Sequence, residues 1–384
     1  MRILLIANSF PISRSDGGIT AMFLSDFALS LTRQGAQVEV LMPGRPENPD
    51  GSSPVPVHQF PWTGSHLVAL SKLRLASPSG LGQAFSLLRN GTQAALECGE
   101  TFRPDFCLAA FALPSGYYAW KICQKLGVPF GVWCLGSDIH TWARKPGFRQ
   151  LTRRILRKSA LLYADGYRLG EEVSELAGKP CDFLPSSGLP SVSRGGTLIE
   201  RDGKVHFLFA GRWELVKGLD LLIDAWRSAK PKNAVLHIAG HGDGLKAEVD
   251  KLSSDPYLKQ SVRVWGKMEK ADVVRLYAGV DCVVIPSRDE SIPVVISECI
   301  RARKPLIVSE AGDMGALVSR YKLGQVVARN DVPALGRALL EFAERKGPPS
   351  TPDWQSAEAL FDIEESARKF LQSAQAFAHS RIQA

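Results

Sequence analysis

The sequence lacks the features that mark several common classes of protein. Its seven cysteines include no C-x-x-C pair, which excludes zinc ribbons and disulfide-dense scaffolds. No apolar run reaches the roughly 18 residues that a membrane-spanning helix needs. The N-terminal apolar run, residues 3–7, is too short for the core of a signal peptide and predicts a first buried strand. We therefore expect a cytoplasmic protein whose cysteines are reduced and buried.

Acidic residues are fewer than basic ones. The 384 residues include 47 Lys and Arg against 39 Asp and Glu, which gives a net charge of +8. Such an excess favours anionic partners: phosphate groups, nucleic acid or the face of an anionic membrane. Acids are absent altogether from residues 51–96 and 141–164, so these two stretches carry only positive charge.

The dominant pattern along the chain alternates short apolar runs with helical segments. Strands are expected at residues 2–7, 37–43, 106–111, 130–136, 161–165, 181–185, 205–211, 235–240, 262–266, 281–287 and 306–309. Helices are expected at 19–33, 115–125, 219–229, 245–253, 270–278 and 294–303. This alternation is typical of α/β folds with parallel sheets buried on both faces, in which ligands bind at the loops that follow the strands' carboxyl ends.

One segment without periodicity, residues 186–203, is rich in Ser, Gly and Pro. It predicts a linker between a first doubly wound, Rossmann-like domain at 1–185 and a second at 204–352. The tail at 353–384 has a helical pattern and is expected to pack back towards the first domain. Two such parallel-sheet domains of similar size would face each other across a cleft.

The first candidate site is the segment FAGRWELVKGLDLLIDAW, where Arg212 and Lys217 lie between an expected strand and helix. Two cations at such a junction suit a diphosphate. Arginine can grip two oxygens, lysine adds a compact charge, and the helix N-terminus adds its partial positive charge. A lone pair of this kind is more often two solvated surface side chains.

The second candidate is the turn in LHIAGHGDGLKAEV, which contains Gly240, Gly242 and Gly244. Glycine permits positive φ and a close approach of a ligand to the backbone. The turn lacks the last glycine of a G-x-G-x-x-G fingerprint and lies far from the N-terminus, so alone it is a weak signal.

The third candidate, DCVVIPSRDESIPVVISECIRARKPLIVSE, places Glu290 and Glu298 eight positions apart, with a helix expected to begin near Pro293. Glu290 then lies in a loop. Glu298 lies more than one turn into the helix, where a carboxylate can accept two hydrogen bonds from a vicinal diol such as ribose. Two acids at an arbitrary spacing are more often a helix cap and a solvated side chain.

The three segments together, in this order, resemble the retaining glycosyltransferases of family four, also called glycosyl transferases group 1, which have the GT-B fold. That family has GR…KG after a strand, then a G-x-G turn, then PS…E-x-x-P-x-x-x-x-E before a strand of the PLIV kind. The match is dense over residues 205–327. In the first half ANSFPISRSDGGIT resembles the family's first loop, WCLGSDIHTW a segment that reaches the sugar donor, and LPSSG the interdomain hinge.

The resemblance implies a role for each candidate residue. Arg212 and Lys217 would clamp the diphosphate of the sugar donor, Glu298 would hold the ribose, and Glu290 would bind the transferred sugar. Backbone amides at Gly17 and Gly18 would approach the phosphates. The implied donor-binding set also contains Gly240, Gly242, Ser291, Ile292 and Val294.

A cleft residue is also implied within GSDIH, where the register leaves both Asp138 and His140 open. The resemblance thus gives a catalytic set of Glu290, Arg212, Lys217, His140 and Asp138. The chain departs from the family pattern at four positions, of which two are small, conservative changes and two, Arg303 and Gly315, bear on the identity of sugar and acceptor more than on the reaction. These positions are Ser291, Cys299, Arg303 and Gly315.

The function implied is transfer of a sugar from a nucleotide diphosphate sugar to a hydroxyl acceptor with retention, in polysaccharide, lipopolysaccharide or glycolipid synthesis. The chain has no D-x-D triplet, so a metal-free site without a cofactor is expected. The expected partners are the nucleotide sugar and a carbohydrate or lipid-linked acceptor, without nucleic acid. The alternatives are a nucleotide-sugar 2-epimerase of the same fold and a non-catalytic binding subunit.

The two acid-free stretches suggest contact with an anionic membrane, and hence a peripheral position on the inner face of the cell membrane. Residues 144–158 carry seven bases, and on a helix Phe148, Leu151 and Ile155 share one face beside a basic one. Residues 51–96 contain Trp62 and scattered leucines. The alternative is that the helix packs its apolar side on the sheet and that 51–96 is an ordinary surface excursion.

Overall fold

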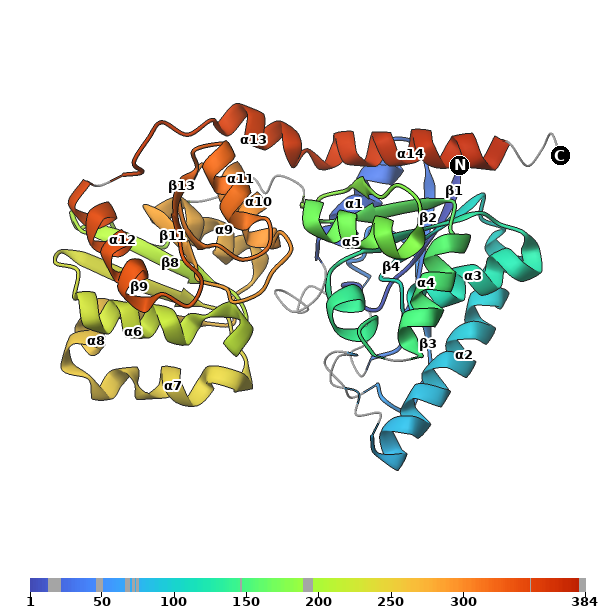
Figure 1. Cartoon of the computed structure of the whole chain (residues 1–384), viewed down its shortest axis with the longest axis horizontal. Coiled ribbons are helices and arrows are strands. Elements are labelled where there is room, and N and C mark those ends of the chain that lie inside the picture. Colours follow the sequence, from blue (N-terminus) through green and yellow to red (C-terminus); the bar gives the residue numbers. More distant parts are fainter. Residues whose placement is uncertain are drawn as a thin grey trace. The chain divides into compact units, whose positions relative to one another are not determined.

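The computed structural model describes residues 1–12, 22–45, 51–65, 70, 73, 76–145, 147–188, 196–345 and 347–379. It divides into two compact units (Figure 1). The first unit comprises Met1–Pro185 and Ile363–Ala384, and the second comprises Ser186–Asp362. Both are parallel α/β units, so the predicted fold class of two Rossmann-like domains is confirmed.

The described part of the first unit contains a seven-stranded parallel sheet in the order β3-β2-β1-β4-β5-β6-β7. Its strands are β1 (Arg2–Ile6), β2 (Gln37–Pro43), β3 (Val57–Phe60), β4 (Phe106–Ala110), β5 (Phe130–Cys134), β6 (Leu161–Ala164) and β7 (Asp182–Phe183). Because the chain runs from β1 to β2 on one side and places β4 on the other, the strand order reverses at β1.

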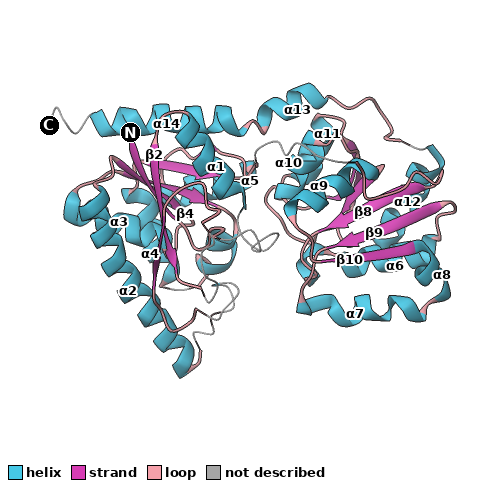
Figure 2. Cartoon of the chain, turned by 180° about the vertical axis from the view of Figure 1, so that it is seen from behind, coloured by secondary structure: helices cyan, strands magenta, loops and turns pink. Residues whose placement is uncertain are grey.

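Helices cover both faces of this sheet (Figure 2). One face carries α1 (Met22–Arg33) packed against α14 (Ile363–His379). The other carries a row of neighbouring helices: α2 (Pro78–Phe102), α3 (Ser115–Leu126), α4 (Phe148–Lys158) and α5 (Tyr167–Ala177). The short π-helical turn η3 (Asp138–Trp142) precedes α4.

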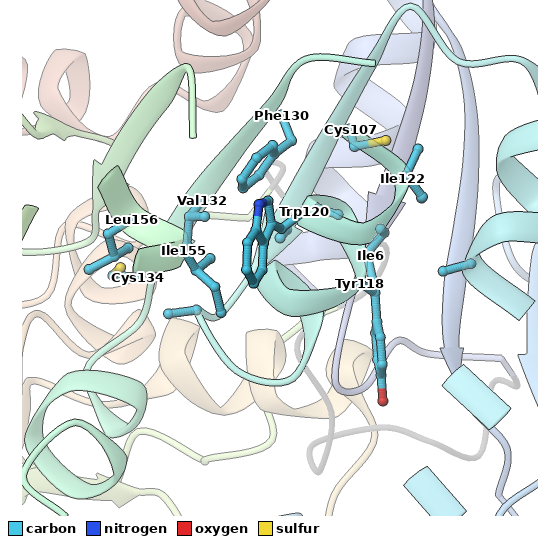
Figure 3. Packing of buried hydrophobic residues seen from close by; sticks show 14 of the residues in the cluster. Ile6, Cys107, Tyr118, Trp120, Ile122, Phe130, Val132, Cys134, Ile155 and Leu156 are labelled. Atoms are coloured by element: carbon cyan, nitrogen blue, oxygen red, sulfur yellow. The ribbon is translucent and has the colours of Figure 1, made fainter. Parts of the chain in front are cut away.

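Figure 3 shows part of the core beneath the helix row, including Trp120, Phe130, Val132 and Ile155. On the opposite face, Phe370 of α14 is fully buried against an aromatic cluster. Its ring centroid lies 5.8 Å from that of Phe27, 5.9 Å from Phe106 and 6.0 Å from Tyr163. The C-terminal helix is therefore part of the first unit's core, although it is last in the sequence.

The second unit contains a six-stranded parallel sheet in the order β10-β9-β8-β11-β12-β13. Its strands are β8 (Val205–Ala210), β9 (Ala234–Ala239), β10 (Val262–Gly266), β11 (Cys282–Ile285), β12 (Leu306–Ser309) and β13 (Gly324–Val327). Its α-helices are α6 (Leu219–Ala229), α7 (Lys246–Asp250), α8 (Pro256–Ser261), α9 (Lys270–Gly279), α10 (Val294–Arg301), α11 (Met314–Arg320), α12 (Val332–Arg345) and α13 (Trp354–Leu360). Here the order reverses at β8, which lies between β9 and β11.

The sequence pattern missed the edge strands β3 and β13 and gave no bounds for the helices α2, α5, α11 and α12. β3 (VHQF) has two adjacent polar residues at its centre, and β13 (GQVV) opens with glycine and glutamine, so neither forms an apolar run. Helix α2 contains four glycines, which lower helix propensity. Two of them are needed for packing: a Cβ at Gly91 would lie 2.4 Å from the Tyr118 ring, and one at Gly99 would lie 2.8 Å from Leu126.

Three expected segments differ from the structure. The helix expected at 245–253 is broken into the 3-10 turn η5 (Asp243–Leu245), α7 and the 3-10 turn η6 (Lys251–Ser254). The tail expected as one piece is split, since α13 belongs to the second unit and α14 to the first. The end of the expected linker packs on the second unit, where Ile199 is buried and the Leu198 amide donates to the Arg275 carbonyl over 3.4 Å.

The cysteines behave as expected. All seven are free, and five are buried. Burial raises the pKa of the Cys98 thiol to about 11. None of the described helices is long and apolar enough to cross a bilayer.

Candidate functional site

The second unit's site lies where the strand order reverses, at the carboxyl ends of β8 and β11. Adjacent parallel strands whose connections leave in opposite directions create a crevice at this point, which is where open α/β sheets bind ligands. The two loops are tied together, because the Arg288 amide donates to the Val216 carbonyl over 2.8 Å. The Arg288 guanidinium also makes a bidentate ion pair with Asp220 at the start of α6, at 2.8 and 2.7 Å.

Lys217 and Glu290 meet across this crevice. The Lys217 Nζ forms an ion pair with Glu290 Oε1, and the Ser287 hydroxyl donates to the same oxygen over 3.3 Å. The side chains are 22% and 13% exposed, so the pair is largely shielded from water. Two residues 73 positions apart in the sequence thus form one charged centre.

Arg212 lies at the same edge and forms a second, more exposed ion pair. Its Nη1 lies 3.1 Å from Glu214 Oε1, and the Arg212 side chain is 49% exposed. Glu214 stands between the two predicted cations in the sequence, and its role was not predicted. The sequence did contain a signal for it, because Glu214 is an acid placed between the two bases of a candidate anion site.

The predicted glycine turn follows β9, and its backbone lies against the β8 loop. Gly240 has φ +124° and Gly242 has φ +151°, values that L side chains rarely adopt. A Cβ at Gly240 would lie 1.8 Å from the Gly211 carbonyl oxygen. These glycines are required for the loops to pack together, whatever ligand they approach.

Glu298 lies in α10, more than one turn after its N-cap, Pro293, as predicted. Its Oε2 accepts a 2.8 Å hydrogen bond from the buried Tyr277 hydroxyl, which fixes one carboxylate oxygen. Ile292 is buried, and the Ser291 Oγ is buried without a hydrogen-bond partner among the described residues. The helix begins at Val294, whose side chain is half-buried.

His241, between the two glycines, is a further basic group at this edge that the sequence pattern did not single out. Burial, followed by the charges of Lys267 and Arg212, lowers the pKa of His241, against an opposing effect of Asp243. Arg212, His241 and Lys267 follow the ends of the adjacent strands β8, β9 and β10. The carboxyl edge therefore carries basic groups on three neighbouring loops.

Three positions that depart from the family pattern lie in α10, just after it, and in α11, and Cys299 directly follows Glu298. Cys299 is fully buried, and Gly315 is buried in α11 against Val326. Arg303 follows the C-terminal end of α10, far along the helix from Val294, and pairs with Glu358 at 2.9 Å.

In the first unit, the structure separates the two residues that the sequence left as alternatives. Asp138 is 1% exposed, and its carboxylate accepts from the Ala112 amide at 2.8 Å and the Leu135 amide at 3.3 Å. Burial raises the Asp138 pKa even though these bonds act in the opposite direction. Asp138 therefore joins the loops after β4 and β5 and presents no carboxylate to a ligand.

His140 is the accessible member of this pair. Its side chain is 23% exposed, and its Nε2 lies 3.4 Å from Glu172 Oε2. The loop after β1 is tied to the start of α3, since the Ser115 hydroxyl donates to Asn8 Oδ1 over 2.7 Å. Gly17 and Gly18, predicted for the same loop, lie outside the described residues.

The basic helix predicted around residues 144–158 is α4, but its apolar side is not free. Ile155 is buried in the core and Leu151 packs against it. Trp62 of the other acid-free stretch is also buried, with its indole donating to the Gly44 carbonyl at 3.0 Å. The helix therefore presents its cations, and not its predicted apolar face, to solvent.

Those cations form a basic surface. All seven are exposed, and none makes an ion pair with any residue that the structure describes: Arg144, Lys145, Arg149, Arg153, Arg154, Arg157 and Lys158. Some lie over aromatic rings, with the Lys145 Nζ 4.6 Å from the centroid of Trp142 and the Arg154 Cζ 5.2 Å from that of Trp120. Helix α2, which is separated from α4 by α3 in the row, exposes Leu81, Phe85 and Leu88.

Comparison with known families assigns both units. The family model described as Glycosyl transferases group 1 matches residues 204–345. The model described as Glycosyl transferase 4-like domain matches residues 17–181. The range 204–345, matched by the first of these models, contains every candidate side chain at the β8 and β11 loops.

Individual relatives agree with this assignment. The glycosyltransferase TuaC of Bacillus subtilis (strain 168), named for teichuronic acid biosynthesis, is 23% identical over 69% of this chain and 69% of its own length. The O-antigen chain mannosyltransferase C of Escherichia coli is 32% identical over 37% of this chain and 38% of its own.

Solved structures share the fold over the whole chain. Sucrose-phosphate synthase from Thermosynechococcus elongatus matches with a TM-score of 0.71 and 16% identity, covering 100% of this chain and 98% of its own. HepE from Anabaena, in complex with UDP, matches with a TM-score of 0.67 and 19% identity over 100% of both chains. With a family model on each unit and the fold shared from end to end, the chain belongs to the group 1 glycosyl transferases and has the GT-B fold.

Proposed function

We propose that the protein transfers a sugar, with retention, from a nucleotide diphosphate sugar to a hydroxyl acceptor in polysaccharide, lipopolysaccharide or glycolipid synthesis. The observation that carries this proposal is the meeting of Lys217 and Glu290 where the strand order reverses. A cation for the diphosphate and a carboxylate for sugar hydroxyls are thereby held at one point, with Arg212 on the same loop as Lys217.

The chemistry follows from the charges. As the bond to the sugar breaks, negative charge grows on the leaving diphosphate, and Arg212, Lys217 and nearby backbone amides stabilise it. The leaving phosphate can accept the proton of the acceptor hydroxyl on the same face of the sugar. We propose that neither a metal nor a cofactor takes part, because the chain has no D-x-D triplet and supplies two cations instead. Activity should therefore persist in EDTA, and a strict requirement for Mg²⁺ or Mn²⁺ would overturn this proposal.

The nucleotide sugar is the part of the proposal with the most direct test. HepE has been solved with UDP and with UDP-glucose, which makes UDP sugars the first to try. A thermal-shift panel of UDP, GDP, ADP and their sugars would identify the base, since a ligand at 100 times its Kd stabilises by about 2.7 kcal/mol. Absence of any shift across the panel would contradict the proposed function.

The two glutamates should separate in kinetics. Glu298, held by Tyr277, is proposed to bind ribose, so Glu298→Ala should mainly raise KM for the sugar donor. Glu290 is proposed to contact the transferred sugar, so Glu290→Ala should mainly lower kcat. The reverse pattern would show that the roles are exchanged. NMR of the nucleotide sugar without acceptor tests the alternative of a 2-epimerase, which would interconvert it.

For the first unit, we propose that it binds the acceptor and that His140 approaches the sugar donor. His140 is the partly exposed residue of the GSDIH segment, whereas Asp138 positions the loops. His140→Ala should therefore lower turnover without a change in melting temperature, and Asp138→Ala should lower both.

We also propose that the first unit docks on an anionic membrane through the unpaired cations of α4 and the exposed stripe of α2. Leu81, Phe85 and Leu88 are 58%, 67% and 40% exposed and recur at helical spacing, so they lie on one face. Each cation near an anionic lipid contributes about 1 kcal/mol. Such docking would give a lipid-linked acceptor access to the enzyme from the bilayer.

A flotation assay with phosphatidylglycerol and phosphatidylcholine vesicles tests docking. The protein should float with the anionic vesicles at low salt, stay behind with the neutral ones, and be released by salt. Arg149→Gln/Arg153→Gln/Arg157→Gln should abolish flotation while keeping transfer to a soluble acceptor. Absence of flotation at low salt would refute the docking surface.

A further inference from the structure

Both cations of the proposed diphosphate clamp are already paired with carboxylates of their own unit. Lys217 pairs with Glu290, and Arg212 pairs with Glu214. A diphosphate that engages these cations must therefore replace a carboxylate on each of them. The cost of that exchange enters the affinity for the nucleotide.

The two pairs differ in their surroundings. Glu290 is 13% exposed, and its oxygen is also held by the Ser287 hydroxyl, so it belongs to the structure of the site. Glu214 is 33% exposed and lies beside an arginine that is 49% exposed. Glu214 can therefore turn into water when Arg212 takes another partner.

Among the residues that the structure describes, Arg212 is the one polar partner of the Glu214 carboxylate. Glu214 is the N-cap residue of the 3-10 turn η4 (Leu215–Lys217), but its side chain makes no capping hydrogen bond. The turn is held by backbone bonds, since the Lys217 amide donates to the Glu214 carbonyl at 2.9 Å. Removing the carboxylate's charge should leave the loop intact.

The loop itself is anchored by the residue between the two partners. Trp213 is 7% exposed, its amide donates to the His241 carbonyl at 3.0 Å, and its carbonyl accepts from the Leu245 amide at 2.9 Å. With this residue fixed, the side chains of Arg212 and Glu214 remain neighbours at the exposed edge of the site.

From these contacts we propose that Glu214 is an internal counter-ion that occupies Arg212 when the site is empty and competes with the diphosphate. The inference rests on the proposed function, because it assumes that the anion at Arg212 is the diphosphate of a nucleotide sugar. Glu214 lowers the affinity of the site for its nucleotide and so speeds release of the product nucleoside diphosphate. It is a positioning residue that acts through Arg212 and does not touch the substrate.

The test is Glu214→Gln, which removes the charge and keeps the size. Binding of UDP, GDP, ADP and inorganic pyrophosphate is measured by calorimetry at two salt concentrations. The nucleoside diphosphate that binds the wild type should bind about three- to tenfold more tightly to the variant, because one repulsive charge and one competing ion pair are removed. The matching uncharged nucleoside should bind both proteins equally, which a general change in loop structure would not produce.

The matched control is Glu344→Gln, which makes the same change in net charge on an exposed residue of the same unit. Glu344 lies in the last turn of α12, a helix that follows β13 and runs back from the carboxyl edge. The Glu344→Gln variant should bind the nucleotide with the same affinity as the wild type. If both variants bound the nucleoside diphosphate more tightly by the same factor, net charge alone would explain the effect, and the proposal would be overturned.

The remaining outcomes are distinct. Unchanged or weaker diphosphate binding by Glu214→Gln would refute the counter-ion, and weaker binding would mean that Glu214 holds Arg212 in its binding position. If the wild type binds neither pyrophosphate nor any nucleoside diphosphate, the proposed function fails first. In turnover, the variant should show a lower KM for the nucleotide sugar and stronger inhibition by the product nucleoside diphosphate.

Discussion

The cations of the two units differ in what surrounds them. At the carboxyl edge of the second sheet, Lys217 and Arg212 each pair with a carboxylate. On α4 of the first unit and the turn before it, seven exposed bases make no ion pair within the described residues, and aromatic rings lie under some of them.

This difference separates two ways of binding anions. Paired cations cost little to keep in a half-buried site, and a ligand binds by exchange, so affinity depends on the geometry of a few atoms. Unpaired surface cations act together through their field, so binding depends on their number and on salt. The first arrangement suits a single small anion, and the second suits an extended charged surface.

The largest expected effect tests whether the two units lose stability independently of each other, which the comparison assumes. Phe370→Ala removes a fully buried ring from the first unit and should destabilise it by about 3–5 kcal/mol. Hydrogen exchange should rise in α1, α14 and the first sheet, and the strands of the second sheet should keep their protection. Loss of protection in the second sheet instead would contradict the placement of α14 in the core of the first unit.

The next effect tests the paired cations. Lys217→Ala should lower kcat/KM by about 100- to 1000-fold, and Arg212→Ala should act in the same direction. The apo proteins should differ: Lys217→Ala leaves the shielded Glu290 without its cation and should cost about 1–2 kcal/mol of stability. Arg212 is half-exposed, so its loss should leave the melting temperature nearly unchanged. Full donor affinity in either variant would contradict the clamp.

A third prediction is that the stabilities of the two units depend differently on pH. In the second unit, Trp265 donates to His237 Nδ1 at 3.0 Å, and His237 Nε2 lies 3.0 Å from His206 Nδ1. Burial, then the charges of His206 and Arg263, lowers the pKa of His237 to about 4. The unfolded chain binds a proton near pH 6.5 that the folded chain refuses, so stability should fall by about 2–3 kcal/mol between pH 6.5 and 4.

The measurement is the unfolding free energy of each unit against pH, followed by hydrogen exchange. In His237→Gln the second unit should lose this acid sensitivity. In the first unit, Asp138 works in the opposite sense, because a raised carboxyl pKa favours the folded state at low pH. Equal acid sensitivity in wild type and His237→Gln would remove the role of His237.

The smallest effect tests the unpaired cations. Arg153→Gln should weaken binding to anionic vesicles about fivefold, since one surface cation contributes about 1 kcal/mol. Lys125 of α3 is the matched control, because it already pairs with Glu100 at 2.6 Å. Lys125→Gln should change vesicle binding much less than Arg153→Gln, and equal effects would show that pairing does not matter.

The sequence by itself determined the α/β class, most strands and the candidate side chains of the second unit. Apolar runs and helical periodicity are local, and Arg212, Lys217, Glu290 and Glu298 were predicted because their motifs keep a fixed order and spacing. Several of the elements that it missed have weak local signals. β3 and β13 are edge strands without apolar runs, and the glycines of α2 are explained only by the helix that they contact.

Only the tertiary structure decided how those residues are used. It paired Lys217 with Glu290, buried Asp138 while leaving His140 partly exposed, and made the last helix part of the first unit's core. It also turned the apolar side of α4 inward, which left the cations as the exposed feature. The physical reason is the same in each case: burial and ion pairing depend on contacts between residues far apart in the chain, and one sequence pattern is compatible with either outcome.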